Sequence, residues 1–183
     1  MADKKIMEEL IIAGFGGQGV LSIGKLLAYA GMIEGLNVAW FPSYGPEMRG
    51  GTANCNVVLS TDPVGSPVVS EADTLIAMNG PSLEKFEDSV KPGGCIFVNS
   101  SLISQKVKRD DVKVYYLDVN DQAIELGNDR VANMVMLGSY MKVKSFPSKE
   151  ATLESFLKVF GERKKDLLPL NEKALDMGAS LIA

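Results

Sequence analysis

A short apolar run followed at once by closely spaced glycines, near the start of the chain, most constrains the fold. Residues 10–13 read LIIA and residues 14–20 read GFGGQGV. After a strand, glycines of this spacing let the chain turn tightly and bring backbone N–H groups near an anion. The helix that follows adds unpaired amides and a partial positive charge. The stretch therefore predicts a strand, a loop and a helix that can hold an anionic group such as a phosphate. The candidate anion-binding residues of this loop are Gly14, Gly16, Gly17, Gln18 and Gly19.

The surroundings of the loop disfavour the common nucleotide sites. A dinucleotide site needs an acidic residue at the end of the second strand, but the strand expected at residues 37–41 leads into AWFPSYG, which contains none. Glu34 falls on the preceding helix, and no Lys-Ser or Lys-Thr pair follows the last glycine, so the Walker pattern fails too. Lys25 is the remaining nearby cation and can fold back toward an anion at the helix start. The alternatives are a glycine turn that only packs the helix on the sheet, and a solvated surface lysine.

The rest of the chain alternates short apolar runs with helical patterns, which is typical of β-α units on a mostly parallel sheet. Apolar runs predict strands at residues 10–15, 37–41, 52–60, 73–78, 95–99 and 112–118. Helical spacing predicts helices at residues 19–34 and 80–94 and in the last third. In the run 52–60, Asn54 and Asn56 alternate with apolar residues, which predicts a strand with one partly buried face, at an edge or lining a cleft. We expect a single Rossmann-like α/β domain over residues 1–183, with a mostly parallel sheet flanked by helices and a helical C-terminal third.

Composition narrows the functional classes. The net charge of −4 and the pI near 5.0 give no electrostatic footprint for nucleic acid or an anionic membrane. No apolar stretch reaches the roughly 20 residues that span a bilayer, and the first ten residues lack the apolar core of a signal peptide, so we expect a cytoplasmic protein. The chain has no histidine, the commonest general base and zinc ligand, and no CxxC, so it cannot ligate an iron–sulfur cluster alone. Cys55 and Cys95 are expected to be buried free thiols.

A second unusual stretch is PSYGPEMRGGTANCNV, residues 42–57. Its prolines and glycines impose turns, and tyrosine, methionine and arginine are enriched at the centres of protein interfaces. The candidates for facing an interface or a shared active site are Tyr44, Glu47, Met48, Arg49 and, on a helix within residues 127–138, Asn133. An ordinary connecting loop and a capping or core role are the alternatives. A lone carboxylate without histidine disfavours independent acid–base catalysis, so no catalytic residue is assigned.

Together these stretches resemble the gamma subunit of 2-oxoacid:ferredoxin oxidoreductases. The resemblance is carried, in order along the chain, by GFGGQGV, SYGPEMRGGTANCNVVLS, ADTLIAMNGPSLEKF and NMVMLG, and it runs from about residue 8 to residue 160. It implies a complex that oxidatively decarboxylates a 2-oxoacid with coenzyme A (CoA) to acyl-CoA, carbon dioxide and reduced ferredoxin. It also implies alpha, beta and ferredoxin-like delta partner subunits, which carry thiamine diphosphate, magnesium and iron–sulfur clusters, with ferredoxin as the electron acceptor.

The resemblance further implies a role in CoA binding. A glycine loop and a following lysine of the family match residues 14–19 and Lys25, which would hold CoA phosphates, while Tyr44, Glu47 and Arg49 would face the partner subunits or the shared cavity. The chain is thus expected to be a non-redox subunit that is inactive alone. SYGPEMRGG most resembles subunits assigned to 2-oxoglutarate, with ketoisovalerate, pyruvate and indolepyruvate as rivals. A scaffold subunit without a ligand and a free-standing nucleotide-binding protein are the alternatives.

Overall fold

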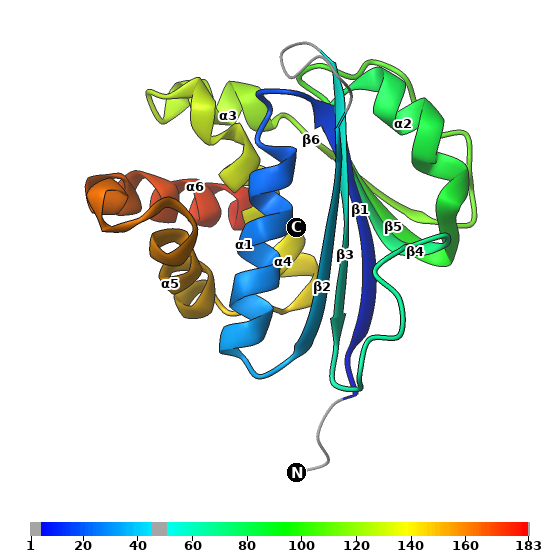
Figure 1. Cartoon of the computed structure of the whole chain (residues 1–183). Coiled ribbons are helices and arrows are strands. Elements are labelled where there is room, and N and C mark those ends of the chain that lie inside the picture. The colour runs from blue at the N-terminus through cyan, green and yellow to red at the C-terminus, as the bar shows by residue number, and fades with distance from the viewer. Residues whose placement is uncertain (1–4, 45–50, 183) are drawn as a thin grey trace.

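A six-stranded sheet forms the centre of the molecule (Figure 1). The computed structural model describes residues 5–44 and 51–182. The strands lie side by side in the order β2-β3-β1-β4-β5-β6. Their bounds are β1 Met7–Phe15, β2 Asn37–Tyr44, β3 Thr52–Ser60, β4 Ala72–Ala77, β5 Val90–Asn99 and β6 Lys113–Leu117.

The sheet is mixed. Strands β1, β4, β5 and β6 pair in parallel, whereas β3 is antiparallel to both β1 and β2. The α/β class, with a sheet flanked by helices, is confirmed, and three of the five strand pairings are parallel. Of the two alternatives for the strand at 52–60, the edge position is wrong, because β3 lies between β1 and β2 and the edge strands of the sheet are β2 and β6. The other alternative agrees with the structure, since Thr52 and Ala53 of β3 line a cavity. Asn54 and Asn56 are nevertheless half-buried, as their alternation predicted.

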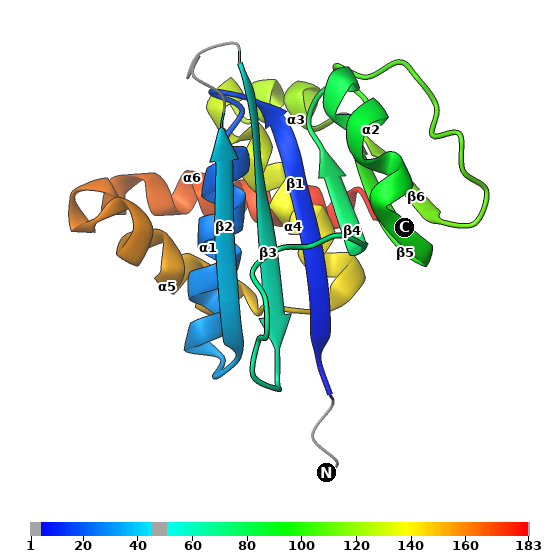
Figure 2. The same ribbon diagram turned by 45° about the vertical axis from the view of Figure 1, so that its right-hand side comes forward.

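Helices cover the two faces of the sheet unequally (Figures 1 and 2). Helix α2 lies on one face, and the other helices form a layer on the opposite face. The helix bounds are α1 Val20–Ile33, α2 Gly80–Phe86, α3 Val119–Glu125, α4 Ala132–Lys144, α5 Lys149–Phe160 and α6 Leu168–Ser180. Three 3-10 turns, η1 Glu87–Ser89, η2 Asp129–Val131 and η3 Glu162–Leu167, precede β5, α4 and α6 respectively.

One predicted helix is shorter than expected. The helix predicted over 80–94 ends at Phe86, and Pro92, Gly93 and Gly94 lie inside β5 rather than after a helix. Gly93 adopts a φ of +80°, and its N–H donates to the carbonyl of Asp111 at 2.7 Å. The proline and glycines therefore shape an irregular start of β5.

The core places the glycine loop at one end of the central strand. Leu10 and Ile12 of β1 are fully buried toward the helical layer, and Ile11 and Ala13 are buried on the face that carries α2. Because β1 is covered on both faces, its sequence is a continuous apolar run instead of an alternating one. The chain leaves this buried strand directly into residues 14–19 and then into α1, which packs against β3 and β2.

Both cysteines are buried and free, as predicted. Burial raises the pKa of the Cys55 thiol to about 12, so the thiol stays protonated at neutral pH. Its Sγ donates to the Val20 carbonyl at 3.6 Å, at the start of α1. In the part of the chain that the structure describes, no group of three or more His, Cys, Asp or Glu residues is placed to hold a metal ion. None of the helices described there is both long and apolar enough to cross a membrane.

Candidate anion-binding site at the start of helix α1

The glycine loop joins the end of β1 to the start of α1. Gly17 and Gly19 adopt φ angles of +99° and +74°, where an L side chain is strained. The backbone itself therefore requires these two predicted glycines. Gly19 is the N-cap of α1, no side chain caps the helix, and its first turn carries no acidic residue. Neither a capping group nor a carboxylate thus competes with an external anion for the helix amides.

Within the described residues, two backbone amides of the loop are hydrogen-bonded, whereas the first three amides of α1 are not. The N–H groups of Gly16 and Gln18 hold the turn by donating to backbone carbonyls at 2.9 and 3.2 Å. The N–H groups of Val20, Leu21 and Ser22, in the first turn of α1, have no acceptor within residues 5–44 and 51–182, as is usual at an uncapped helix start. They lie at the positive end of the helix dipole, so the arrangement favours a bound anion.

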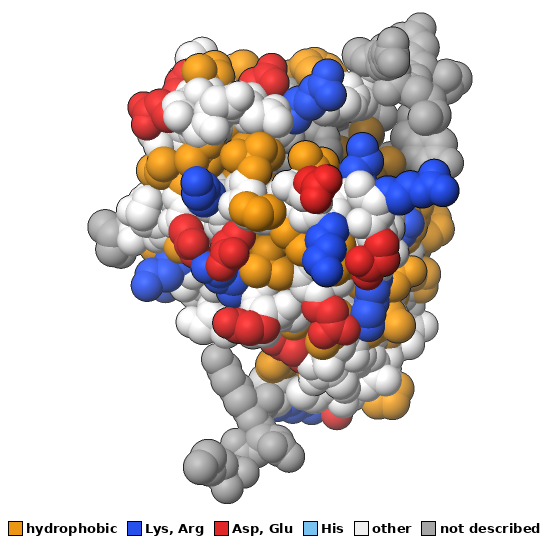
Figure 3. Space-filling view, turned by 90° about the vertical axis from the view of Figure 1, so that its left-hand side faces the viewer, with side chains coloured by type: hydrophobic (Ala, Val, Ile, Leu, Met, Phe, Trp, Pro, Cys, Tyr) orange, Lys and Arg blue, Asp and Glu red, His pale blue; other side chains and the backbone are white. Residues whose placement is uncertain are grey.

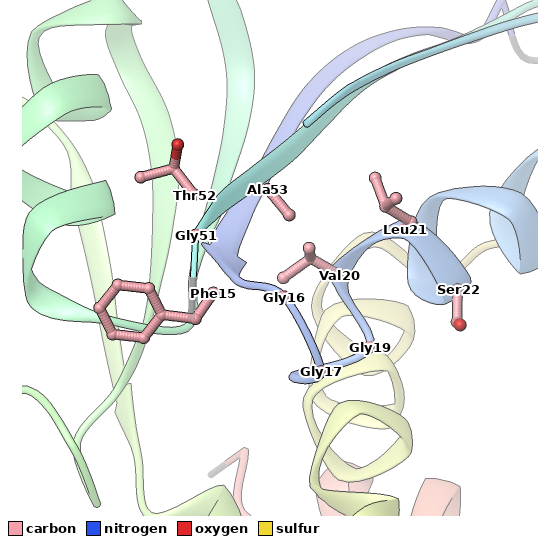
Figure 4. A pocket seen from close by; sticks show the side chains of 10 residues that line it. All are labelled: Phe15, Gly16, Gly17, Gly19, Val20, Leu21, Ser22, Gly51, Thr52 and Ala53. Atoms are coloured by element: carbon pink, nitrogen blue, oxygen red, sulfur yellow. The ribbon is translucent and has the colours of Figure 1, made fainter. Parts of the chain in front are cut away.

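A cavity of about 510 Å³ opens beside these amides (Figure 4). Figure 4 shows the side chain of Val20 pointing toward Ala53 of β3, while the ring of Phe15 points away from α1. Apart from backbone groups, the polar lining of the cavity consists of the hydroxyls of Ser22 and Thr52, and the other lining side chains are apolar. The lining residues are Phe15, Gly16, Gly17, Gly19, Val20, Leu21, Ser22, Gly51, Thr52 and Ala53. The cavity can accommodate an anion on the helix amides together with an uncharged, partly apolar segment of the same ligand.

Gln18 has a structural role within this loop. The Phe15 N–H donates to Gln18 Oε1 at 2.6 Å, and Gln18 Nε2 donates to the Met78 carbonyl at 3.0 Å, just beyond β4. A Cβ on Gly14 would lie 2.7 Å from Gln18 Oε1 and 2.9 Å from Met78 Cβ. Gly14 therefore leaves room for the glutamine, and the Gln18 carboxamide ties the end of β1 to the end of β4.

Gln18→Ala is expected to lower the free energy of unfolding by about 1–3 kcal/mol, because it leaves the Phe15 N–H without its acceptor in a part-buried position. Chemical denaturation of the purified chain measures this. Gln105→Ala is the control, since the Gln105 side chain bonds Glu84 on an exposed surface. Equal losses in the two variants would contradict the structural role of Gln18.

Lys25 lies on α1, one turn beyond the loop. It follows Leu21 by four residues and Ser22 by three, so it shares their helix face. Its Nζ lies 6.0 Å from the centre of the Trp40 ring of β2, and the side chain is half-buried. Lys25 does not line the cavity as observed, so contact with an anion on the amides of α1 requires its side chain to turn toward the helix start.

The structure brings Asn133 to the glycine loop. Asn133 lies at the start of α4, and a Cβ on Gly19 would approach its Nδ2 to 2.5 Å. Its carboxamide therefore packs directly on the N-cap of α1. The backbone of Tyr44 ends β2, but its side chain lies outside the described residues. The predicted interface residues Glu47, Met48 and Arg49 also lie outside the described residues.

A second cavity, of about 440 Å³, lies against the other side of the helix start and contains residues that the sequence patterns did not single out. Gly19 and Ser22 line both cavities. The second cavity is also lined by Asn128, Arg130, Val131, Asn133, Met134, Phe156, Phe160, Lys164, Leu167, Leu170 and Asn171. Arg130 and Lys164 are its cations. In the sequence, Arg130 belongs to the triplet NDR after Gly127, and Lys164 belongs to the basic run at 163–165. Neither pattern predicts that these side chains lie near residue 19.

Proteins of known family share the sequence pattern and the fold of this chain. The profile of the family described as pyruvate ferredoxin/flavodoxin oxidoreductase matches residues 9–181. The ketoisovalerate oxidoreductase subunit VorA of Methanothermobacter thermautotrophicus is 41% identical over 92% of this chain. This chain spans about a third of that relative, 35% of its length.

Two solved structures are also similar. The gamma subunit of a keto/oxoacid ferredoxin oxidoreductase from Geobacter sulfurreducens superposes with a TM-score of 0.80 and 28% identity, covering 95% of this chain and 97% of that one. A 2-oxoglutarate:ferredoxin oxidoreductase from Magnetococcus marinus, with 2-oxoglutarate, coenzyme A and succinyl-CoA bound, has a TM-score of 0.85 and 28% identity, covering 98% of this chain and 31% of that one. These matches confirm the resemblance to gamma subunits, and the chain belongs to the pyruvate ferredoxin/flavodoxin oxidoreductase family.

Proposed function

We propose that this chain is the gamma-type subunit of a multi-subunit 2-oxoacid:ferredoxin oxidoreductase and helps to bind coenzyme A. The observation that carries the proposal is the uncapped start of α1, whose free amides face a cavity in a member of this family. The Magnetococcus relative, which contains a region of this fold, was solved with coenzyme A. The complex would convert a 2-oxoacid and CoA to acyl-CoA and carbon dioxide and pass the electrons to ferredoxin.

In this proposal the first-turn amides of α1 bind the CoA diphosphate. Lys25 turns from Trp40 toward the same phosphates, and the apolar wall of the first cavity accepts the uncharged pantetheine arm. Phosphate on backbone amides at a helix start gains both hydrogen bonds and the field of the helix dipole. The subunit positions CoA and supplies no acid, base or nucleophile, so it has no activity alone.

The redox and decarboxylation groups are assigned to partner chains. Cys55 and Cys95 are both buried and free and are the two cysteines of the chain, fewer than the four thiolates that hold an iron–sulfur cluster. Thiamine diphosphate, magnesium and the clusters would therefore lie on alpha, beta and delta subunits. A cytoplasmic location fits this assembly.

The proposed oxoacid is 2-oxoglutarate, as the motif around residues 43–51 predicts, and the Magnetococcus relative acts on that substrate. Ketoisovalerate is the second candidate, because VorA is 41% identical to this chain. A scaffold role without a ligand is the competing function. It is favoured by the close packing of Gly14 against Gln18 and Met78, which a turn used only for packing also requires.

The proposal is tested by purifying the tagged chain from its native cells and assaying oxoacid-dependent and CoA-dependent dye reduction. Co-purification of larger chains with this activity is expected. In the assembled complex, Lys25→Ala is expected to raise the KM for CoA about tenfold with little change in kcat, because a charge-assisted hydrogen bond to phosphate is lost. Lys173→Ala, an exposed lysine of α6, is the control.

Two results would count against the proposal at different levels. A chain that purifies alone, without the activity, overturns the subunit assignment. A complex whose KM for CoA is the same with Lys25→Ala as with Lys173→Ala removes Lys25 from the CoA site and leaves the subunit assignment in place.

A further inference from the structure

A chain of side-chain amides runs from helix α3 to the glycine loop. Asn99, the last residue of β5, donates from Nδ2 to Asn120 Oδ1 of α3 at 2.8 Å and to the Met78 carbonyl oxygen at 3.3 Å. Gln18 Nε2 donates to the same Met78 oxygen at 3.0 Å, and Gln18 Oε1 accepts from the Phe15 N–H. Asn99 therefore reaches the glycine loop through one shared carbonyl group.

The peptide group that receives these bonds lies where three strands end. Met78 directly follows β4, and its N–H donates to the Ala13 carbonyl of β1 at 2.8 Å. In the sheet, β4 lies between β1 and β5, so the Met78 carbonyl accepts one bond from Gln18 after β1 and one from Asn99 on β5. Gln18 immediately precedes Gly19, the N-cap of α1. The direction of this carbonyl therefore affects where the first amides of α1 lie.

Asn99 is an expensive residue for a buried position. Its side chain is fully buried, and its Oδ1 has no hydrogen-bond partner in the described part of the chain. Leaving a buried carbonyl unpaired costs free energy, and an apolar side chain of similar size would avoid that cost. Figure 3 shows the outer surface of the helical layer, where charged side chains reach solvent, whereas Asn99 lies beneath this layer and against α3. An uncompensated polar group in the interior favours a role other than stability.

We propose that Asn99 is a positioning residue of the CoA site. It fixes the direction of the Met78 carbonyl, the carbonyl fixes the Gln18 carboxamide, and Gln18 places the first amides of α1 where phosphate oxygens can accept their bonds. Hydrogen bonds weaken steeply with misalignment, so a small displacement of these amides weakens CoA binding. Asn99 itself contacts neither CoA nor a reacting atom. This inference rests on the proposed function, and it adds a residue of β5, a strand that lines neither of the two larger cavities.

Asn99→Leu in the assembled complex tests this role. The change removes both Nδ2 bonds and the unpaired Oδ1, and it keeps a side chain of similar size. The KM for CoA is expected to rise about fivefold with little change in kcat, because the binding of CoA is weakened before and during the reaction alike. The urea midpoint of the purified chain is expected to stay within about 0.5 M of its unchanged value, because removing the unpaired oxygen offsets the lost bonds.

Two further variants complete the test. Asn99→Ser fits within the same space and removes the same donor, so it replaces Asn99→Leu if that variant fails to assemble, and it should raise the KM for CoA in the same way. Asn37→Leu is the matched control. Asn37 Nδ2 also donates to a backbone carbonyl, that of Thr61 at 3.2 Å, but it lies at the end of the sheet opposite the glycine loop. Its KM for CoA should not change.

The combination of KM and stability decides between positioning and structure. A lower urea midpoint with an unchanged KM for CoA makes Asn99 a structural residue only, and a lower kcat with an unchanged KM also overturns the inference. The Lys25→Ala result separates this from a failure of the proposed function. A raised KM with Lys25→Ala, but not with either Asn99 variant, keeps CoA on α1 and removes Asn99 from its positioning. An unchanged KM in all of these variants counts against CoA binding by this subunit altogether.

Discussion

Lys144→Met is expected to lower the free energy of unfolding by about 3–5 kcal/mol at pH 8, because it leaves a buried carboxylate without its counter-ion. Lys144 ends α4, and its Nζ lies 3.0 Å from Glu8 Oε1 of β1, with only 17% and 8% of the two side chains exposed. Thr74 Oγ1 of β4 donates to the same Glu8 oxygen at 2.6 Å. The pair therefore joins the helical layer to the central strand, far from the glycine loop.

The loss should depend on pH in a defined direction. Burial already raises the pKa of Glu8 above its ordinary 4.5, and Lys144 and Thr74 oppose that rise while the nearby Asp73 adds to it. Removing Lys144 raises the folded-state pKa of Glu8 further. A carboxyl group whose folded pKa is above its unfolded value favours folding below the unfolded pKa, and this contribution is lost as pH rises through the folded pKa. The deficit of Lys144→Met should therefore be smallest near pH 4.5 and grow toward pH 8.

Urea denaturation at pH 5 and pH 8 measures both effects. Lys158→Met is the matched control, because Lys158 pairs with Glu154 on an exposed helix surface and should lose less than about 1 kcal/mol. The double variant Glu8→Gln/Lys144→Met removes both charges and should recover much of the loss. A deficit in Lys144→Met that is the same at both pH values, or no larger than that of Lys158→Met, would contradict this account.

Gly178→Ala is expected to destabilise the protein by about 3 kcal/mol, because helices α4 and α6 touch through their backbones at this residue. A Cβ on Gly178 would lie 1.8 Å from the Val135 carbonyl oxygen, and a Cβ on Gly138 would lie 2.1 Å from the Leu175 carbonyl oxygen. The obstacle in each case is backbone, which a rotamer change cannot relieve. The methyl group therefore forces the two helices apart and disturbs the core around Tyr140.

Thermal and chemical denaturation of Gly178→Ala measure this loss. Gly65→Ala is the matched control, since Gly65 has open space around its Cβ position and an ordinary φ. That change should be neutral or slightly stabilising, because alanine restricts the unfolded chain. If Gly178→Ala is as stable as Gly65→Ala, the result would contradict the close backbone contact between α4 and α6.

Local sequence patterns determined the β1–loop–α1 unit. The apolar run at 10–13 and the glycine spacing at 14–19 each act within a few residues, so they predicted a strand, a tight turn and a following helix with little dependence on the rest of the chain. Local patterns also predicted the helices of the last third and the burial of both cysteines. The glycine part of the candidate site is therefore visible in the sequence, and so is the family, from the order of its motifs.

Contacts between distant segments were decided only by the tertiary structure. The alternation in 52–60 shows that one face is half-buried, but it cannot show that β3 pairs with strands on both sides. The glycine motif predicts that Gln18 binds a ligand, yet its carboxamide forms hydrogen bonds with the backbone of Phe15 and Met78. Arg130 of η2 and Lys164 of η3 line the same cavity as Gly19, the N-cap of α1. Glu8 pairs with Lys144 across 136 residues. Periodicity and spacing report which face of an element is buried, whereas the packing of whole elements decides which side chains share a cavity or a charge.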